Sequence, residues 1–320
     1  MERRECIFLI GTAAFWSVAA LAQSKAPPQI AIVGSLGQGA LDSFNDGLRE
    51  FGLIDKKTVI LVGGPGIVAR NALAKQISDA IAKNVDLIFA SGALAGSLAK
   101  DATSTIPIVC ITGDLVAAGL VNSLSKPGGN ITGICNLTAE ASAKRLELLK
   151  ELDPALSRVA VFFNPDDATS PLSVKPLKAA AAKLRLGLEL IGVRTERDFE
   201  AGIALAVQTK SQAIALTSNP LFDVGGKQIA AFAVENKLAT MSFADSFPKV
   251  GGLVSYGPHI RAAYRRSAFL VSRILNGTSP AELPVEQPTR FNLVINLRTA
   301  KALGLKVPDI LLTSADEVIE

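Results

Sequence analysis

The sequence predicts an α/β protein built from two Rossmann-like lobes with parallel sheets. A chain of 320 residues is longer than one compact core usually organises. Short aliphatic runs alternate with amphipathic helical patterns along the chain, and this alternation begins again near its middle. Aromatic residues make up only 5% of the composition, which favours aliphatic strands in a parallel sheet over an all-β sandwich.

The first residues are typical of an export signal. Arg3 and Arg4 precede an apolar stretch over 7–20, and the Ala20-Leu21-Ala22 triplet fits cleavage after residue 22. The stretch is too short to span a bilayer comfortably. We therefore expect residues 1–22 to be a signal peptide and the mature protein to be periplasmic. The arginine pair leaves both the general and the twin-arginine export routes open.

The first half of the mature chain has the strand–helix alternation of a parallel sheet. The predicted strands cover 29–33, 58–62, 85–90, 106–111 and 131–134. The predicted helices cover 40–51, 71–83 and 94–102. Apolar residues at helical spacing, such as Leu73, Ile77 and Ile81, support the second helix.

The pattern starts again after a predicted helix over 139–152. Further strands are predicted at 158–163, 188–193, 213–217, 240–243 and 252–256. Further helices are predicted at 177–186, 198–208, 227–236 and 261–275, with Gly277 as a stop signal after the last. Two such series imply two parallel sheets, each covered by helices on both faces.

Polar residues recur where the predicted strands end. In open parallel sheets, ligands bind beyond the carboxyl ends of the strands, and a cleft between two lobes would gather both sets of ends. The residues at these ends are small and polar or acidic: Ser35, Ser91, Asp114, Asn136, Asn164, Asn219 and Asp245.

The sequence lacks the patterns of common catalytic and metal sites. His259 is the only histidine and no Cys-x-x-Cys occurs, so we expect no metal. The glycine-rich run at 63–66 is not followed by Gly-Lys-Ser/Thr, and no Gly-x-Ser-x-Gly is present. Cys110 and Cys135 are typical of buried apolar side chains, although export would also permit a disulfide. We expect no cofactor and no enzymatic activity.

The charge of the chain argues against nucleic-acid binding. The formal net charge is only +4, and no long basic run is interleaved with aromatic residues. The sensor core of a transcription regulator would need a helix-turn-helix segment ahead of it, where this chain has its export signal. We expect a monomer that binds a small-molecule ligand.

Short segments spread over the mature chain carry a family resemblance. They include Ile106-Pro107-Ile108-Val109, Gly113-Asp114, 119–124 (GLVNSL), 126–133 (KPGGNITG), 144–152 (KRLELLKEL), 251–257 (GGLVSYG), 283–289 (LPVEQPT), 294–297 (VINL) and 300–305 (AKALGL). As a set they resemble the ABC-transporter substrate-binding family related to tryptophan/tyrosine-type importers.

The resemblance implies a type I periplasmic-binding-protein-like fold with three interlobe crossings. It places the crossings near 135–136, 257–258 and 284–289. The first lobe would comprise 29–135 plus 259–283, and the second 136–257 plus 290–320. Proteins of this architecture close around a ligand by hinge motion at such crossings. The implied partner is an ABC importer permease in the membrane.

The segment Ser91-Gly92-Ala93 is the first predicted ligand contact. It opens a helix directly after a strand, so free backbone N–H groups and the positive helix end would suit a carboxylate, together with the Ser91 hydroxyl. The resemblance implies a carboxylate-binding loop at this position. The alternative is a plain helix N-cap.

The acidic candidates are Asp114 and Asp245, which could together neutralise a ligand ammonium. Their alternative roles are helix capping or a surface salt bridge. The amides of Asn136, Asn164 and Asn219 suit a neutral polar group. For Asn164 and Asn219 the alternative is turn formation, because each precedes a proline.

Tyr256, beside Gly257 at an implied crossing, is the aromatic candidate for an apolar wall of the cleft. The expected function is extracytoplasmic solute binding for an ABC importer. The ligand would be amino-acid-like, or a carboxylate or amide. The alternatives are a ligand-sensing receptor for a signalling partner and, with less support, a hydrolase on this fold.

Overall fold

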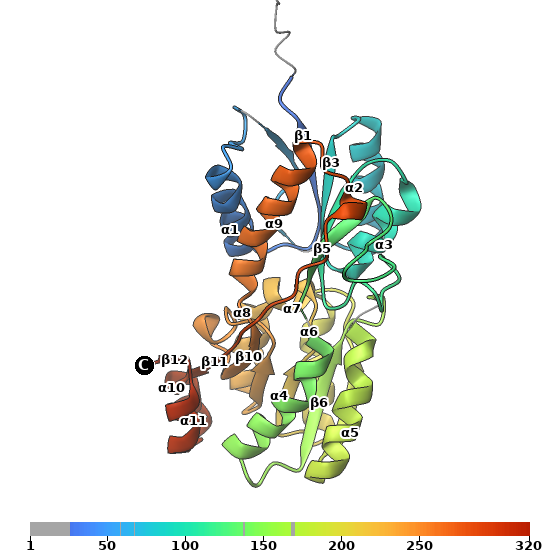
Figure 1. Ribbon diagram of the computed structural model, residues 1–320. Coiled ribbons are helices and arrows are strands. Elements are labelled where there is room, and N and C mark those ends of the chain that lie inside the picture. The colour runs from blue at the N-terminus through green and yellow to red at the C-terminus, as the bar shows by residue number, and fades with distance from the viewer. Residues whose placement is uncertain (1–25, 58, 67, 137, 168–169) are drawn as a thin grey trace, which may run out of the picture.

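The computed structural model describes residues 26–320 except 58, 67, 137 and 168–169. Figure 1 shows two α/β lobes, one above the other, with the segment that leads to β11 running from the upper lobe to the lower one. The expected signal peptide lies outside the described residues. Within the part of the chain that is described, no helix is long and apolar enough to cross a membrane.

The first lobe contains a five-stranded sheet in the order β2-β1-β3-β4-β5, with every pair parallel. Its strands are β1 (Gln29–Gly34), β2 (Ile60–Val62), β3 (Leu87–Ser91), β4 (Ile108–Thr112) and β5 (Ile131–Cys135). Its helices are α1 (Gln38–Glu50), α2 (Arg70–Ala82), α3 (Ala93–Ala102) and, from much later in the chain, α9 (Ile260–Leu275).

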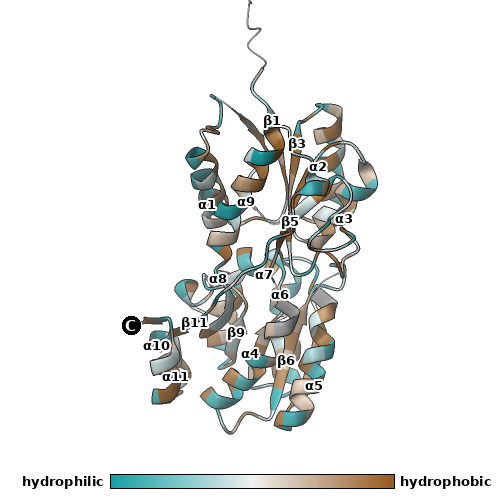
Figure 2. Ribbon diagram, in the orientation of Figure 1, coloured by the Kyte–Doolittle hydropathy of each residue, from teal (hydrophilic) through white to brown (hydrophobic). Residues whose placement is uncertain are grey.

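The alternation of side chains along β1 shows how this sheet is covered. Ile30 and Ile32 pack in the cluster under α1 and α9, whereas Ala31 and Val33 pack in the cluster under α2 and α3. Successive side chains of a strand point to opposite faces, so a continuous aliphatic strand needs helices on both sides. Figure 2 shows the resulting apolar strands inside and the hydrophilic helix faces outside.

The second lobe contains a seven-stranded sheet in the order β12-β11-β10-β9-β8-β6-β7. Its strands are β6 (Arg158–Phe163), β7 (Gly187–Gly192), β8 (Ala213–Leu216), β9 (Ala239–Ser242), β10 (Val254–Pro258), β11 (Phe291–Asn296) and β12 (Glu317–Ile319). The helices are α4 (Thr138–Leu152), α5 (Val174–Leu184), α6 (Asp198–Gln208), α7 (Pro220–Val224), α8 (Gly226–Glu235), α10 (Leu297–Leu303) and α11 (Asp309–Ser314). Short 3₁₀ turns lie at Ser170–Ser173, Pro248–Val250 and Pro280–Glu282.

The predicted α/β class with parallel sheets in two lobes is confirmed, with one pair of strands as an exception. β11 runs antiparallel to β10. The chain leaves this lobe at the carboxyl end of β10, enters α9, and returns from the first lobe at that same end. The returning strand must therefore run in the opposite direction.

The chain passes between the lobes three times: from β5 to α4, from β10 to α9, and from Leu283 to Phe291. The third passage runs beside β5 and is bonded to it. The N–H of Cys135 donates to the Glu286 carbonyl oxygen at 2.9 Å, and the Glu286 N–H donates to Gly133 at 3.0 Å. A Cβ on Gly133 would overlap the Cys110 carbonyl oxygen, so only glycine fits there.

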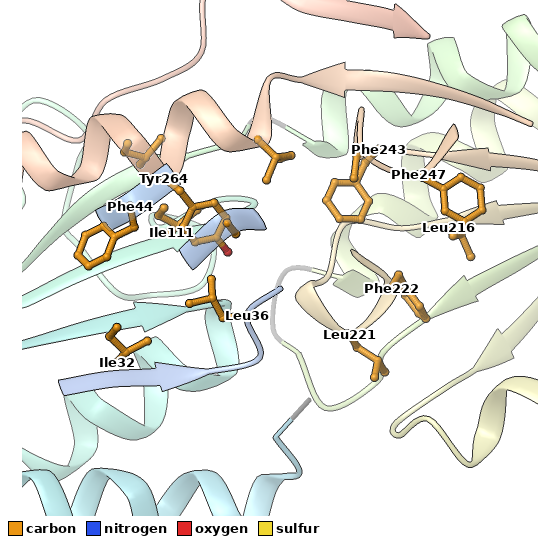
Figure 3. Packing of buried hydrophobic residues seen from close by; sticks show 14 of the residues in the cluster. Ile32, Leu36, Phe44, Ile111, Leu216, Leu221, Phe222, Phe243, Phe247 and Tyr264 are labelled. Carbon is orange, nitrogen blue, oxygen red and sulfur yellow. The ribbon is translucent and has the colours of Figure 1, made fainter. Parts of the chain in front are cut away.

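One apolar cluster continues from the first lobe into the second. In Figure 3, Leu36, Phe44, Ile111 and Tyr264 lie on one side of the interlobe gap, and Leu216, Leu221, Phe222, Phe243 and Phe247 lie on the other. The lobes also touch directly, since a Cβ on Gly92 would lie 3.2 Å from the Pro220 side chain. The structure therefore has its two lobes closed against each other.

Candidate ligand-binding cleft between the lobes

Two adjoining hollows lie between the carboxyl ends of the two sheets. The arginine compartment, named for Arg70 and Arg194 in its wall, has a volume of about 480 Å³ counted to its mouth. The tyrosine compartment, named for Tyr264, has about 380 Å³. The two share Gly92, Asp167 and Pro220, so they form one continuous cleft lined by both lobes.

Most of the polar strand-end residues predicted from the sequence line this cleft. They comprise Ser35, Ser91, Gly92, Asn164 and Asn219 in the arginine compartment, and Gly92 again with Asn136 in the tyrosine compartment. Ala93 is fully buried beneath them, and its neighbours Leu94 and Ala95 line the arginine compartment instead.

A hydrogen-bond chain fixes the Ser91 hydroxyl at the end of β3. Ser91 Oγ donates to the Ser35 carbonyl oxygen at 2.6 Å and lies 2.8 Å from Tyr264 Oη. A serine hydroxyl has one hydrogen, so the Tyr264 hydroxyl must be the donor to Ser91. Burial raises the pKa of the Tyr264 phenol well above its usual range, which keeps that hydrogen in place. Ser35 Oγ accepts from the Val68 N–H at 3.0 Å, which ties down the segment before α2.

The first turn of α3 opens on the arginine compartment. Gly92 is its N-cap, has φ 96°, and provides no side chain to cap the helix. The leading N–H groups of a helix carry partial positive charge and bind anions well. Arg70 lines the same compartment, and Arg194 lies there 3.5 Å from Asp166. This end of the cleft suits a carboxylate.

Three acidic side chains that the sequence did not predict line the cleft, and one of them, Asp166, lies in the arginine compartment beside Arg194. Asp167 is 2% exposed and borders both compartments, with its Oδ2 3.9 Å from where a Cβ on Gly92 would lie. Asp223, from α7, lines the tyrosine compartment and accepts a hydrogen bond from Ser246 Oγ at 2.6 Å. Burial and, after it, the neighbouring Asp245 raise the pKa of Asp223, against opposing effects of Ser246 and Arg261.

The three predicted asparagines differ in what their side chains do. Asn164 Oδ1 accepts from the Asp166 N–H at 3.0 Å, and Asn219 Oδ1 caps α7 by accepting from the Leu221 N–H at 2.9 Å. Both therefore form local turns while lining the cleft. Asn136 is 6% exposed at the first crossing, and its Oδ1 has no hydrogen-bond partner among the described residues.

The remaining predicted residues, Asp114, Asp245 and Tyr256, line neither compartment. Asp114 Oδ1 accepts from the N–H groups of Val116 and Ala117, at 2.9 and 3.0 Å. The Tyr256 ring stacks on Phe291 with centroids 5.8 Å apart.

Asp245 lies behind the tyrosine compartment. It borders a neighbouring hollow together with Asp223 and Arg261. Its Oδ2 is 3.5 Å from Nδ1 of His259.

The apolar part of the tyrosine compartment comes from both lobes. Ile111 and Ile260 belong to the first lobe, and Phe243 and Pro220 belong to the second. Figure 3 shows Phe243 and Tyr264 approaching the gap from opposite sides. An apolar frame with a few convergent polar groups is typical of small-molecule sites.

The chain matches known proteins along most of its length. A family model described as ABC transporter substrate binding protein covers residues 31–319. A tyrosine-binding protein of Clostridioides difficile (strain R20291) is 29% identical over 223 residues, which are 69% of this chain. The matched part spans 64% of that protein's own length.

Solved structures agree with this fold. A conserved domain protein of Vibrio cholerae superposes with a TM-score of 0.82 at 26% identity, over 91% of this chain and 99% of that one. An ABC domain from Streptococcus pneumonia in complex with L-Trp superposes with a TM-score of 0.81 at 24% identity, over 92% of this chain and 100% of that one. A ligand-free, open substrate-binding protein of Clostridium difficile superposes with a TM-score of 0.59 at 26% identity, over 91% of this chain and 99% of that one. The matched family consists of substrate-binding proteins and the curated relative is a tyrosine-binding protein, which agrees with the expectation from the sequence that the chain is not an enzyme.

Proposed function

We propose that this chain, which belongs to the family of ABC transporter substrate-binding proteins, captures a free α-amino acid in the interlobe cleft and presents it to a membrane importer. One observation carries the proposal. The uncapped first turn of α3, which follows Gly92, and the buried Asp167 carboxylate meet where the two compartments join, one from each lobe. This pair matches a carboxylate and an ammonium on one carbon atom.

The carboxylate would lie in the arginine compartment. The N–H groups of the first turn of α3 have no side-chain cap and can donate to it. Arg70 adds a positive charge in the same wall. Charge-assisted hydrogen bonds of this kind are about twice as strong as neutral ones.

The ammonium would lie at the junction, against Asp167. A buried carboxylate is costly unless it is paired and hydrogen-bonded. A ligand cation at this position would add to its pairing between the two lobes. Asp223 lies farther along the same cleft, where its carboxyl group can accept a hydrogen bond.

The relatives support an aromatic amino acid as the ligand. One is a tyrosine-binding protein, and another structure of this fold holds L-Trp. In this chain the tyrosine compartment has apolar walls from Phe243, Ile111 and Ile260, which suit contact with a ring.

Closure of the lobes belongs to the same proposal, with hinges at the three passages and the first lobe comprising 29–135 plus 259–283. The packing of α9 on α1 and on β4 and β5 supports that division. At equal identity and coverage, the TM-score falls from 0.82 to 0.59 when the comparison is the open, ligand-free relative. A different orientation of two similar lobes would produce such a fall. Export by the signal peptide at 1–22 would place the protein in the periplasm, beside its permease.

The test is calorimetric titration with L-tyrosine, L-tryptophan and two tyrosine analogues, one without the carboxylate (tyramine) and one without the ammonium (3-(4-hydroxyphenyl)propionate). We expect the amino acids to bind and each analogue to lose about 100-fold in affinity or more. Asp167→Asn should weaken the amino acids and leave the deaminated acid unchanged, whereas Asp101→Asn on the exposed end of α3 should alter neither. Equal affinity for L-tyrosine and its deaminated analogue would contradict the proposed ammonium site.

A further inference from the structure

We infer that the tyrosine compartment recognises a hydrogen-bond donor at the far end of the ligand's side chain, so that tyrosine and tryptophan bind more tightly than phenylalanine. The inference rests on the proposed function, because it takes the ligand to be an amino acid held at the junction by its carboxylate and ammonium. It adds a specificity rule and names Asn136 and Tyr264 as the residues that enforce it.

The hydroxyl hydrogen of Tyr264 already takes part in a hydrogen bond within the protein. Ser91 donates its single hydrogen to the Ser35 carbonyl oxygen, so the Tyr264 hydroxyl donates to Ser91. The Tyr264 oxygen is then left with acceptor capacity only. Tyr264 is 5% exposed and lines the compartment, so this acceptor lies in the cleft wall rather than in bulk water.

Asn136 presents a second acceptor in the same wall. Its Oδ1 is buried and has no hydrogen-bond partner among the residues that the structure describes. Buried polar atoms are almost always hydrogen-bonded, and one that is not requires a reason. Because Asn136 lines the tyrosine compartment, a ligand donor in that compartment would supply the missing bond.

The rest of the tyrosine compartment has both polar and apolar lining residues. Asp223 presents a carboxyl group whose Oδ1 already accepts from Ser246. Ile111, Phe243 and Ile260 form apolar walls, and Thr112 and Ser218 add hydroxyl groups that can donate or accept. The compartment thus combines apolar walls with the two acceptors on Tyr264 and Asn136, and an N–H or O–H at the end of a ring satisfies both features.

The covalent structure of the ligand explains why its side chain, and not its ammonium, would enter the tyrosine compartment. The ammonium and carboxylate of an amino acid are attached to one carbon, and the helix terminus holds the carboxylate in the arginine compartment. The ammonium must then stay near the junction at Asp167 and Gly92. The tyrosine compartment remains for the side chain.

The first test compares ligands on the unaltered protein. Calorimetric titration should give L-phenylalanine about tenfold weaker binding or more than L-tyrosine, and 1-methyl-L-tryptophan a similar loss relative to L-tryptophan. A ring without a donor leaves the buried acceptors unpaired, which costs affinity. Equal affinities within both pairs would overturn the inference and leave the proposed function standing. Failure of all four amino acids to bind would overturn the proposed function itself.

The second test changes the acceptor. Asn136→Leu should bring the tyrosine-to-phenylalanine affinity ratio close to one, because the unpaired oxygen is gone. Asn236→Leu, at the exposed C-terminal end of α8, is the matched control and should keep the ratio of the unaltered protein. If the tyrosine-to-phenylalanine affinity ratio of Asn136→Leu equalled that of the unaltered protein, Asn136 would not determine specificity, whatever its effect on overall affinity.

Discussion

Cys110 and Cys135 lie in neighbouring strands of the first lobe and remain unbridged and buried. Burial raises the pKa of both thiols, that of Cys135 to about 11. The thiolate is the nucleophilic form of cysteine, so a raised pKa and a buried sulfur both suppress reactivity. These residues act as small apolar side chains of the sheet.

The prediction at this scale concerns their reactivity. Iodoacetamide at pH 8 should leave both thiols of the native protein unmodified for hours, since neither sulfur is ionised or accessible. In guanidinium chloride both should be alkylated within minutes. Mass spectrometry of the two samples measures the difference, and modification of the native protein at the unfolded rate would contradict the buried placement.

The sequence identified cleft residues where a strand end alone fixes the position. Ser35, Ser91 and Asn136 follow or end strands, and the sheet rule places such residues at one edge. Asp223 was missed because the five-residue helix α7 is too short for a periodic signal. Tyr264 was missed because its apolar spacing in α9 is that of a core residue, and only the packing of α9 on this lobe brings its hydroxyl to Ser91.

At the scale of elements, α10 depends on one residue for its start. Asn296 Oδ1 accepts from the Thr299 N–H at 3.0 Å, and its Nδ2 donates to the Pro248 carbonyl oxygen at 2.7 Å. The side chain thus caps the helix and also joins it to the turn before β10. Asn296 is 5% exposed, so water cannot easily replace either bond.

Asn296→Ala should therefore lower the free energy of unfolding by about 1–2 kcal/mol, the usual cost of losing a helix cap. Urea unfolding followed by circular dichroism provides the measurement. Asn276→Ala at the C-cap of α9 is the control and should cost much less, because the one bond that its side chain makes to the described residues is a long 3.5 Å contact with Ser272. Equal losses would show that the cap of α10 is not the cause.

Strands that are buried along their whole length, such as β3 and β4, were predictable, because burial on both faces requires a continuous apolar run. The direction of β11 was not. It follows from where the chain re-enters the second lobe, which no local pattern of residues encodes. β12 has three residues and acquires strand geometry only by pairing with β11.

At the scale of the whole molecule, Gly92 controls how closely the lobes approach. Its φ of 96° strains any other residue, and a Cβ there would lie 3.2 Å from the Pro220 side chain, a tight contact when the lobes are closed. We expect L-tyrosine to reduce the radius of gyration of the protein in small-angle X-ray scattering. Gly92→Ala should bind the same ligand about tenfold more weakly or worse, because closure would then be strained.

The control for this prediction is Gly64→Ala, whose Cβ meets no atom within 4 Å and whose φ is not positive. That variant should keep both the affinity and the ligand-dependent compaction. A radius of gyration that does not change with ligand, in the unaltered protein, would contradict closure as the binding event.

The return of α9 to the first lobe has a consequence for how the chain is made. A ribosome completes β1 to β5 long before it reaches Ile260, yet α9 packs on α1 and shares with it the covering of one face of that sheet. Until then the nascent lobe exposes an apolar surface, and the edge of β5 lacks Glu286 as a partner. The sheet of the second lobe is also incomplete until the end of synthesis, because β11 and β12 are translated last. Neither half can therefore mature during synthesis, and both become complete together, when nearly all of the polypeptide is available.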